Sequence, residues 1–101
     1  MNLSNRQMLR SAVKIGQNWN AADDGATFSV INPANGDKLG EVPLCGAAET
    51  RRAIAAANDA WPAWRALTAR QRGQLLRAWF DLIVANAEDL AAARAAGLEA
   101  A

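Results

Sequence analysis

The character of the sequence changes at Gly46, and this change limits the folds that the chain can adopt. Before Gly46, short apolar runs alternate with clusters of Gly, Asn, Asp and Pro, a pattern typical of short strands joined by turns. After Gly46, helix-forming residues dominate, alanine above all. A chain of 101 residues is at most one small domain. The sequence therefore predicts an α+β fold in which short antiparallel strands come first and helices follow.

The strand half contains one well-marked β-hairpin. Residues 27–31 alternate in polarity, and residues 38–42 provide a partner strand of similar length. Between them, Asn35-Gly36 suits a turn with positive φ. Pro43 should end the second strand because proline has no amide hydrogen for the ladder.

A shorter strand pair is predicted upstream of this hairpin. Residues 12–15 lead into a turn at Gly16-Gln17-Asn18, which is followed by Trp19. Asp23-Asp24-Gly25 has the composition of a second turn.

Three helices are predicted in the second half. In the first, Ile54, Ala57, Trp61 and Trp64 recur at helical spacing. Pro62 should either end that helix at Trp61 or begin a fresh turn.

The second helix should begin at Thr68, because Thr68-Ala69-Arg70-Gln71 matches a capping box. The third should begin near Asn86, where Glu88 and Asp89 are well placed for the helix macrodipole. The second helix carries one broad apolar face, formed by Leu75, Leu76, Trp79, Phe80, Leu82 and Ile83.

We divide the chain into an irregular N-terminal arm at residues 1–11, a β-hairpin region at 12–43 and a helical region at 47–99. The last helix has one strong apolar anchor, Leu90, and it ends almost where the chain ends. Both features favour the interpretation that this is a single, incomplete domain.

The sequence lacks the side chains that most active sites use. It has no histidine, no tyrosine and one cysteine, Cys45, and it contains no glycine-rich phosphate-binding motif. Ser-His and Cys-His nucleophile pairs are therefore excluded, as is a zinc site. The apolar neighbours of Cys45 predict a small buried or half-buried side chain. We predict no catalytic, no cofactor-binding and no metal-ligating residue.

The charge pattern excludes two further classes of partner. Eleven basic and ten acidic residues give a net charge of +1, and the longest basic run is Arg51-Arg52. Such a sequence offers no footprint for nucleic acid. Its apolar runs fall short of the roughly 20 residues that span a membrane, and the N-terminus lacks the apolar centre of a secretion signal. We expect a cytoplasmic protein that binds neither nucleic acid nor membrane.

Several motifs, taken in order, resemble the aldehyde dehydrogenase superfamily. The turn Asn32-Pro33-Ala34-Asn35-Gly36 and the strand ending Glu41-Val42-Pro43 are similar to its N-terminal hairpin. Ile15-Gly16-Gln17-Asn18-Trp19 resembles the strand and turn before that hairpin. Pro62-Ala63-Trp64-Arg65 and Leu76-Arg77-Ala78-Trp79-Phe80 resemble parts of its first two helices. The details are most similar to the succinate-semialdehyde dehydrogenase branch.

This resemblance implies an activity for a parent enzyme. Such enzymes oxidise succinate semialdehyde to succinate with NAD or NADP, using a cysteine thiolate in a G-Q-x-C context and a glutamate in an E-L-G-G context. Cys45 does not match the first context, and Gly97-Leu98-Glu99 matches the second only superficially. The resemblance therefore implies an N-terminal scaffold that is inactive and binds no cofactor by itself.

Two hypotheses about partners follow. In the first, the remainder of the parent enzyme packs against this segment. In the second, the chain is a small, non-enzymatic interaction module that dimerises or binds a partner through its aromatic helices. Aromatic residues at helical spacing usually pack into a core or an interface, so Trp61, Trp64, Trp79 and Phe80 are predicted to be packing residues under either hypothesis.

Overall fold

The computed structural model describes residues 3–97. Four short strands precede three helices, which confirms the predicted α+β fold class. The elements are a 3₁₀ helix (Arg6–Met8), strands β1 (Val13–Ile15), β2 (Asn18–Asn20), β3 (Thr27–Ile31) and β4 (Lys38–Pro43), and helices α1 (Ala47–Ala66), α2 (Ala69–Ala85) and α3 (Ala87–Gly97). Residues 98 and 99 of the predicted helical region lie outside the described residues.

Both predicted strand pairs form antiparallel hairpins. In β3–β4, Phe28 pairs with Val42, and the register shifts between Val30 and Ile31. The connecting turn places Gly36 at a φ of 78°, a conformation that glycine adopts without steric cost. The Gly36 amide donates to the Asn32 carbonyl at 2.8 Å.

The β1–β2 hairpin packs against α1 through small residues. Gly16 lies at the hairpin tip with a φ of 59°, and a Cβ built on it would come 3.8 Å from the Cβ of Ala56. Ala53, Ala57 and Ala60 continue the same seam along the helix. The alanine-rich composition of α1 therefore lets the backbone of the hairpin come close to the helix.

Helix α1 continues through Pro62 to Ala66, so the prediction of a break at Trp61 or a fresh turn was wrong. Proline removes only its own amide from the i to i−4 series, and the residues after it can still donate to the preceding turn. The predicted start of α2 is confirmed. The Gln71 amide donates to Thr68 Oγ1 at 3.2 Å, and the Thr68 amide donates to Gln71 Oε1 at 2.9 Å.

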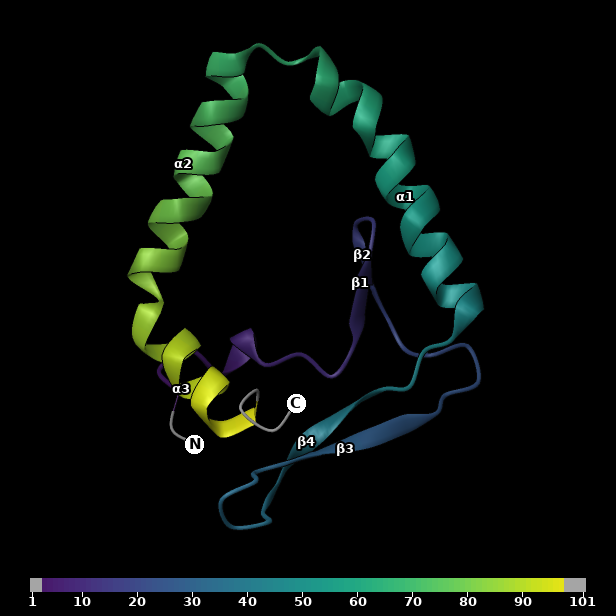
Figure 1. The fold of residues 1–101 in the computed structure, drawn as a ribbon, viewed down its shortest axis with the longest axis vertical. Coiled ribbons are helices and arrows are strands. Elements are labelled where there is room, and N and C mark those ends of the chain that lie inside the picture. Colours follow the sequence, from purple (N-terminus) through teal and green to yellow (C-terminus); the bar gives the residue numbers. More distant parts are fainter. Residues whose placement is uncertain (1–2, 98–101) are drawn as a thin grey trace.

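The elements form an open frame (Figure 1). Helices α1 and α2 make its two long sides and meet at a corner, while α3, the N-terminal arm and the β3–β4 hairpin lie along its base. The radius of gyration is 16.5 Å, against about 13 Å for a compact domain of this length. The accessible surface is 7904 Å², against about 5,500 Å² for a folded monomer of 10.7 kDa.

The frame encloses almost no hydrophobic core. Among the residues whose burial the structure describes (3–95), Ala22 and Pro43 are the buried apolar ones, and no side chain is less than 2 % exposed. The other two buried residues, Glu49 and Asp89, are acidic. The described part of the chain therefore leaves many large apolar residues of the helices uncovered.

Candidate docking surface

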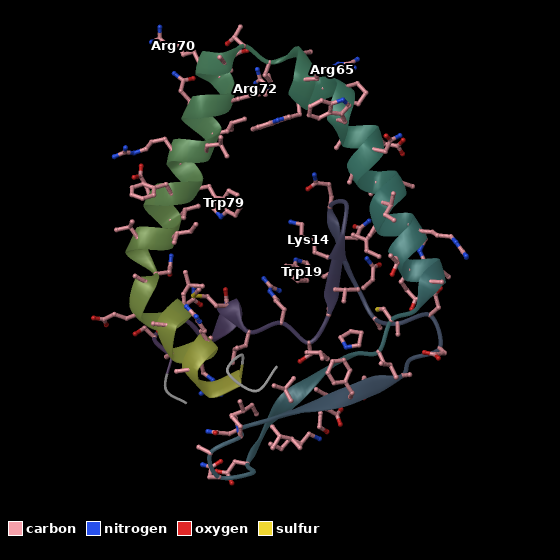
Figure 2. All side chains as sticks on the ribbon, viewed as in Figure 1. Lys14, Trp19, Arg65, Arg70, Arg72 and Trp79 are labelled. Carbon is pink, nitrogen blue, oxygen red and sulfur yellow. The ribbon has the colours of Figure 1, made fainter. Side chains whose placement is uncertain are left out.

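In the described part of the chain, more of the exposed large apolar residues lie on α2 than on any other element. We call it the α2 apolar face; its members, each 44–64 % exposed, are Leu75, Leu76, Trp79, Phe80, Leu82 and Ile83. At 3.6 residues per turn they spread over roughly 160° of the helix, wider than the stripe of about 100° that suffices for a helix lying on one surface. Figure 2 shows Trp79 directed from α2 toward the inside of the frame. The described part of the chain leaves this face uncovered.

Helix α1 adds a second apolar area. Trp61 is 49 % exposed and Ile54 is 64 % exposed. Trp61 and Trp64, together with Ala57 and Ala60, line an open hollow of about 440 Å³. A hollow with two indole rings and two small residues can accept an apolar side chain from a partner surface.

The β1–β2 hairpin contributes an aromatic ring flanked by cations. Trp19 is 47 % exposed, and the Arg10 guanidinium and the Lys14 ammonium lie 5.0 and 5.8 Å from its ring centroid. Both distances are within the range of cation–π attraction. Trp19 and Lys14 are on the inner side of the frame in Figure 2, as is Trp79.

The carboxylate of Asp89, in α3, binds the backbone of the N-terminal arm. Both oxygens of Asp89 accept backbone amides, from Ser4 and from Asn5, each at 2.8 Å. Asp89 is 9 % exposed and lies in the first turn of α3. This pair of charge-assisted hydrogen bonds ties the N-terminal arm to the α2–α3 junction, which closes the frame at its base.

Replacing Asp89 with Asn should release the arm, because an amide nitrogen then faces a backbone N–H that also donates. We expect hydrogen exchange at the Ser4 and Asn5 amides in the intact protein to accelerate by about 10-fold or more. The matched control is Glu88→Gln, since Glu88 is exposed and also lies in the first turn of α3. Equal acceleration by both variants would mean that general charge at the helix terminus, and not the two hydrogen bonds, holds the arm.

Cys45 lies beside the start of α1 in an open hollow that Asp23 and Glu49 also line. The Arg52 guanidinium donates two hydrogen bonds to the Asp23 carboxylate, at 2.5 and 2.9 Å, and this holds the pKa of Asp23 below its ordinary value. Partial burial, followed by the nearby Glu49 carboxylate, raises the pKa of the Cys45 thiol. A raised pKa keeps the thiol protonated and poorly nucleophilic. Cys45 is half-buried, as predicted.

The helix N-termini in the described residues carry caps and negative charge where a phosphate of a dinucleotide would bind. The N-termini of helices, which often bind phosphate, are capped here by the chain itself. At α1 the Glu49 carboxylate accepts the Gly46 amide at 2.9 Å, and at α2 the capping residues are Thr68 and Gln71. At α3 the Asp89 carboxylate places negative charge in the first turn. Residues 3–97 also contain no cluster of three or more His, Cys, Asp or Glu that could hold a metal ion.

The predicted turns and the capping box are found where the sequence placed them. Of the four tryptophans, Trp19, Trp61 and Trp79 are exposed on the described chain and Trp64 is half-buried. Sequence reasoning missed the Asp89 contact, because an acid in the first turn of a helix is explained equally well by the macrodipole. It also missed the grouping of Arg10, Lys14 and Trp19, for which the spacing gives no signal. No helix among residues 3–97 has the length and hydropathy needed to cross a membrane.

Comparison with known proteins identifies the class to which this frame belongs. The sequence model of the aldehyde dehydrogenase family matches residues 19–98, and the chain is a member of that family. The resemblance noted in the turn and helix motifs is thereby confirmed.

Individual relatives show which members of the family the chain resembles. The chain is 52 % identical over 91 residues both to the glutarate-semialdehyde dehydrogenase of Pseudomonas putida and to the NADP(+) succinate-semialdehyde dehydrogenase GabD of Escherichia coli. In each case the match covers 90 % of this chain and 19 % of the relative. A crystal structure of succinate-semialdehyde dehydrogenase from Burkholderia pseudomallei superposes with a TM-score of 0.86 at 52 % identity, over 90 % of this chain and 19 % of that one.

Proposed function

We propose that this chain is the N-terminal scaffold of an NAD(P)-dependent aldehyde dehydrogenase that oxidises succinate semialdehyde, or a closely similar semialdehyde, to the carboxylic acid. The chain itself contributes packing surface and no catalytic residue. The remainder of the parent enzyme is its partner, and that remainder supplies the nucleophile, the general base and the cofactor site.

This proposal is supported chiefly by one observation: the open frame has the same fold as a segment of a much larger enzyme. The frame exposes about 2,400 Å² more than a compact monomer of its mass. That excess is of the size that obligate interfaces bury. The same frame superposes with a TM-score of 0.86 on 19 % of a solved dehydrogenase chain. A shape that is unfavourable for an isolated domain is thus the shape found in part of a larger fold.

The substrate class rests on the relatives. Proteins named for succinate semialdehyde and for glutarate semialdehyde match this chain at the same 52 % identity. Both compounds carry an aldehyde at one end and a carboxylate at the other. The relatives therefore support a semialdehyde that carries a carboxylate as the substrate class. We place succinate semialdehyde first because both the relative GabD and the solved structure are named for it.

A chimeric enzyme tests this assignment. The 91 matching residues of this chain replace the corresponding segment of the E. coli succinate-semialdehyde dehydrogenase, and the product is assayed for NADP(+) reduction with succinate semialdehyde. We expect a soluble enzyme whose activity is within about 10-fold of the unmodified relative, because the docking surface should fit a remainder from the same branch. The 101-residue chain without that remainder should show no turnover. An insoluble or inactive chimera would contradict the proposed scaffold role.

A further inference from the structure

One charged residue continues the α2 apolar face toward the corner of the frame. Arg72 precedes Leu75, Leu76 and Trp79 by three, four and seven residues, the spacing that places side chains on one side of a helix. Figure 2 shows Arg72 on the inner side of α2 near the corner, whereas Arg70 is directed away from the frame. Arg72 is half-buried, whereas the residues of the α2 apolar face are exposed.

Within the described chain, Arg72 has no acidic partner. The ion pairs among residues 3–97 join Lys38 to Glu41, Arg52 to Asp23 and Arg77 to Asp81, and none involves Arg72. No acidic residue occurs between Asp59 and Asp81, so this part of both helices offers no carboxylate.

The charge is also unfavourable for α2 itself. Arg72 lies in the first turns after the Thr68 cap, where the helix macrodipole is positive and a cation is disfavoured. Once a partner covers the α2 apolar face, the guanidinium becomes buried as well. A buried charge without an opposite charge is strongly destabilising, so the covering surface must supply that charge.

We propose that the α2 apolar face docks on an apolar surface of the parent enzyme that carries a single Asp or Glu, and that this carboxylate receives Arg72 at the corner end of the helix. The inference rests on the proposed function, because the occupant is the part of the enzyme outside this chain. The inference adds the chemistry of the partner surface. That surface is apolar where it faces α2 from Leu75 to Ile83, and it carries an acidic residue where it faces Arg72. A planar guanidinium suits a two-point contact with a carboxylate.

The direction in which Arg72→Leu changes the stability of the chimeric enzyme separates this proposal from simple packing. If Arg72 contributes only its aliphatic stem, Arg72→Leu in an apolar interface should leave the enzyme as stable as before or make it more stable. If a carboxylate faces Arg72, the same change leaves that carboxylate buried and unpaired. We expect Arg72→Leu in the chimeric enzyme to raise the unfolded fraction at a fixed urea concentration by about 100-fold.

Three comparisons complete the test. Arg70→Leu, in the same turn but directed outward, should leave the urea midpoint unchanged. Arg72→Lys should yield a soluble enzyme with a midpoint between those of Arg72→Leu and the starting chimera, because it keeps the charge and loses the planar contact. An Arg72→Leu enzyme as stable as the starting chimera would overturn the proposal, as would equal losses for Arg72→Lys and Arg72→Leu. If the starting chimera is active, either result leaves the proposed function intact; a starting chimera that is inactive overturns the proposed function and this inference with it.

Discussion

Expressed alone, the 101-residue chain will bind an apolar dye strongly and will melt without a sharp transition. Cooperative unfolding requires a core whose side chains depend on one another for burial. In residues 3–95 no side chain is less than 2 % exposed, while several large apolar residues are about half exposed or more. Dye fluorescence and a thermal scan by circular dichroism measure both properties. The same preparation should reduce no NAD or NADP with succinate semialdehyde.

The contrary result has a clear structural meaning. A sharp melting transition, weak dye binding and a dimer by light scattering would show that two copies cover their own apolar faces. That outcome would favour the interaction-module hypothesis over the scaffold. Adding the remainder of the enzyme in trans serves as the control, because on the scaffold hypothesis dye binding falls when the remainder covers the α2 apolar face.

Trp79→Asp should have little effect on the structure of the isolated chain and a large effect on the chimeric enzyme. In the isolated chain Trp79 is 63 % exposed, so its replacement should leave helix content unchanged and reduce dye binding. In the chimeric enzyme the same residue is expected to be covered. Removing a buried indole costs about 3–5 kcal/mol, and burying a carboxylate adds several more. We expect no soluble, active chimera from this variant.

Gln74→Asp is the matched control for that experiment. It introduces the same carboxylate into α2, five residues earlier and on the polar side of the helix. We expect the Gln74→Asp chimera to keep its activity and its urea midpoint. If Trp79→Asp and Gln74→Asp behave alike in the chimera, the inner side of α2 is not the docking surface.

The element types could be predicted because their causes are local. The alternation around Phe28, the glycine at position 36 with positive φ and the Thr68–Gln71 cap each act within a few residues. The failed prediction at Pro62 shows the limit of such reasoning. Proline removes one helical hydrogen bond, but the sequence does not show whether the rest of the helix retains enough contacts to continue.

The sequence by itself determined the class of this protein. The order of strands and helices, the absence of histidine and tyrosine, and the family resemblance can all be read from the printed residues. Only the tertiary structure decided that Trp19, Trp61 and Trp79 remain exposed, that Asp89 holds the N-terminal arm and that Arg72 is half-buried without an acidic partner among residues 3–97. The physical reason is that local propensity acts over a few residues, whereas burial depends on segments far apart in the chain, such as Ser4 and Asp89.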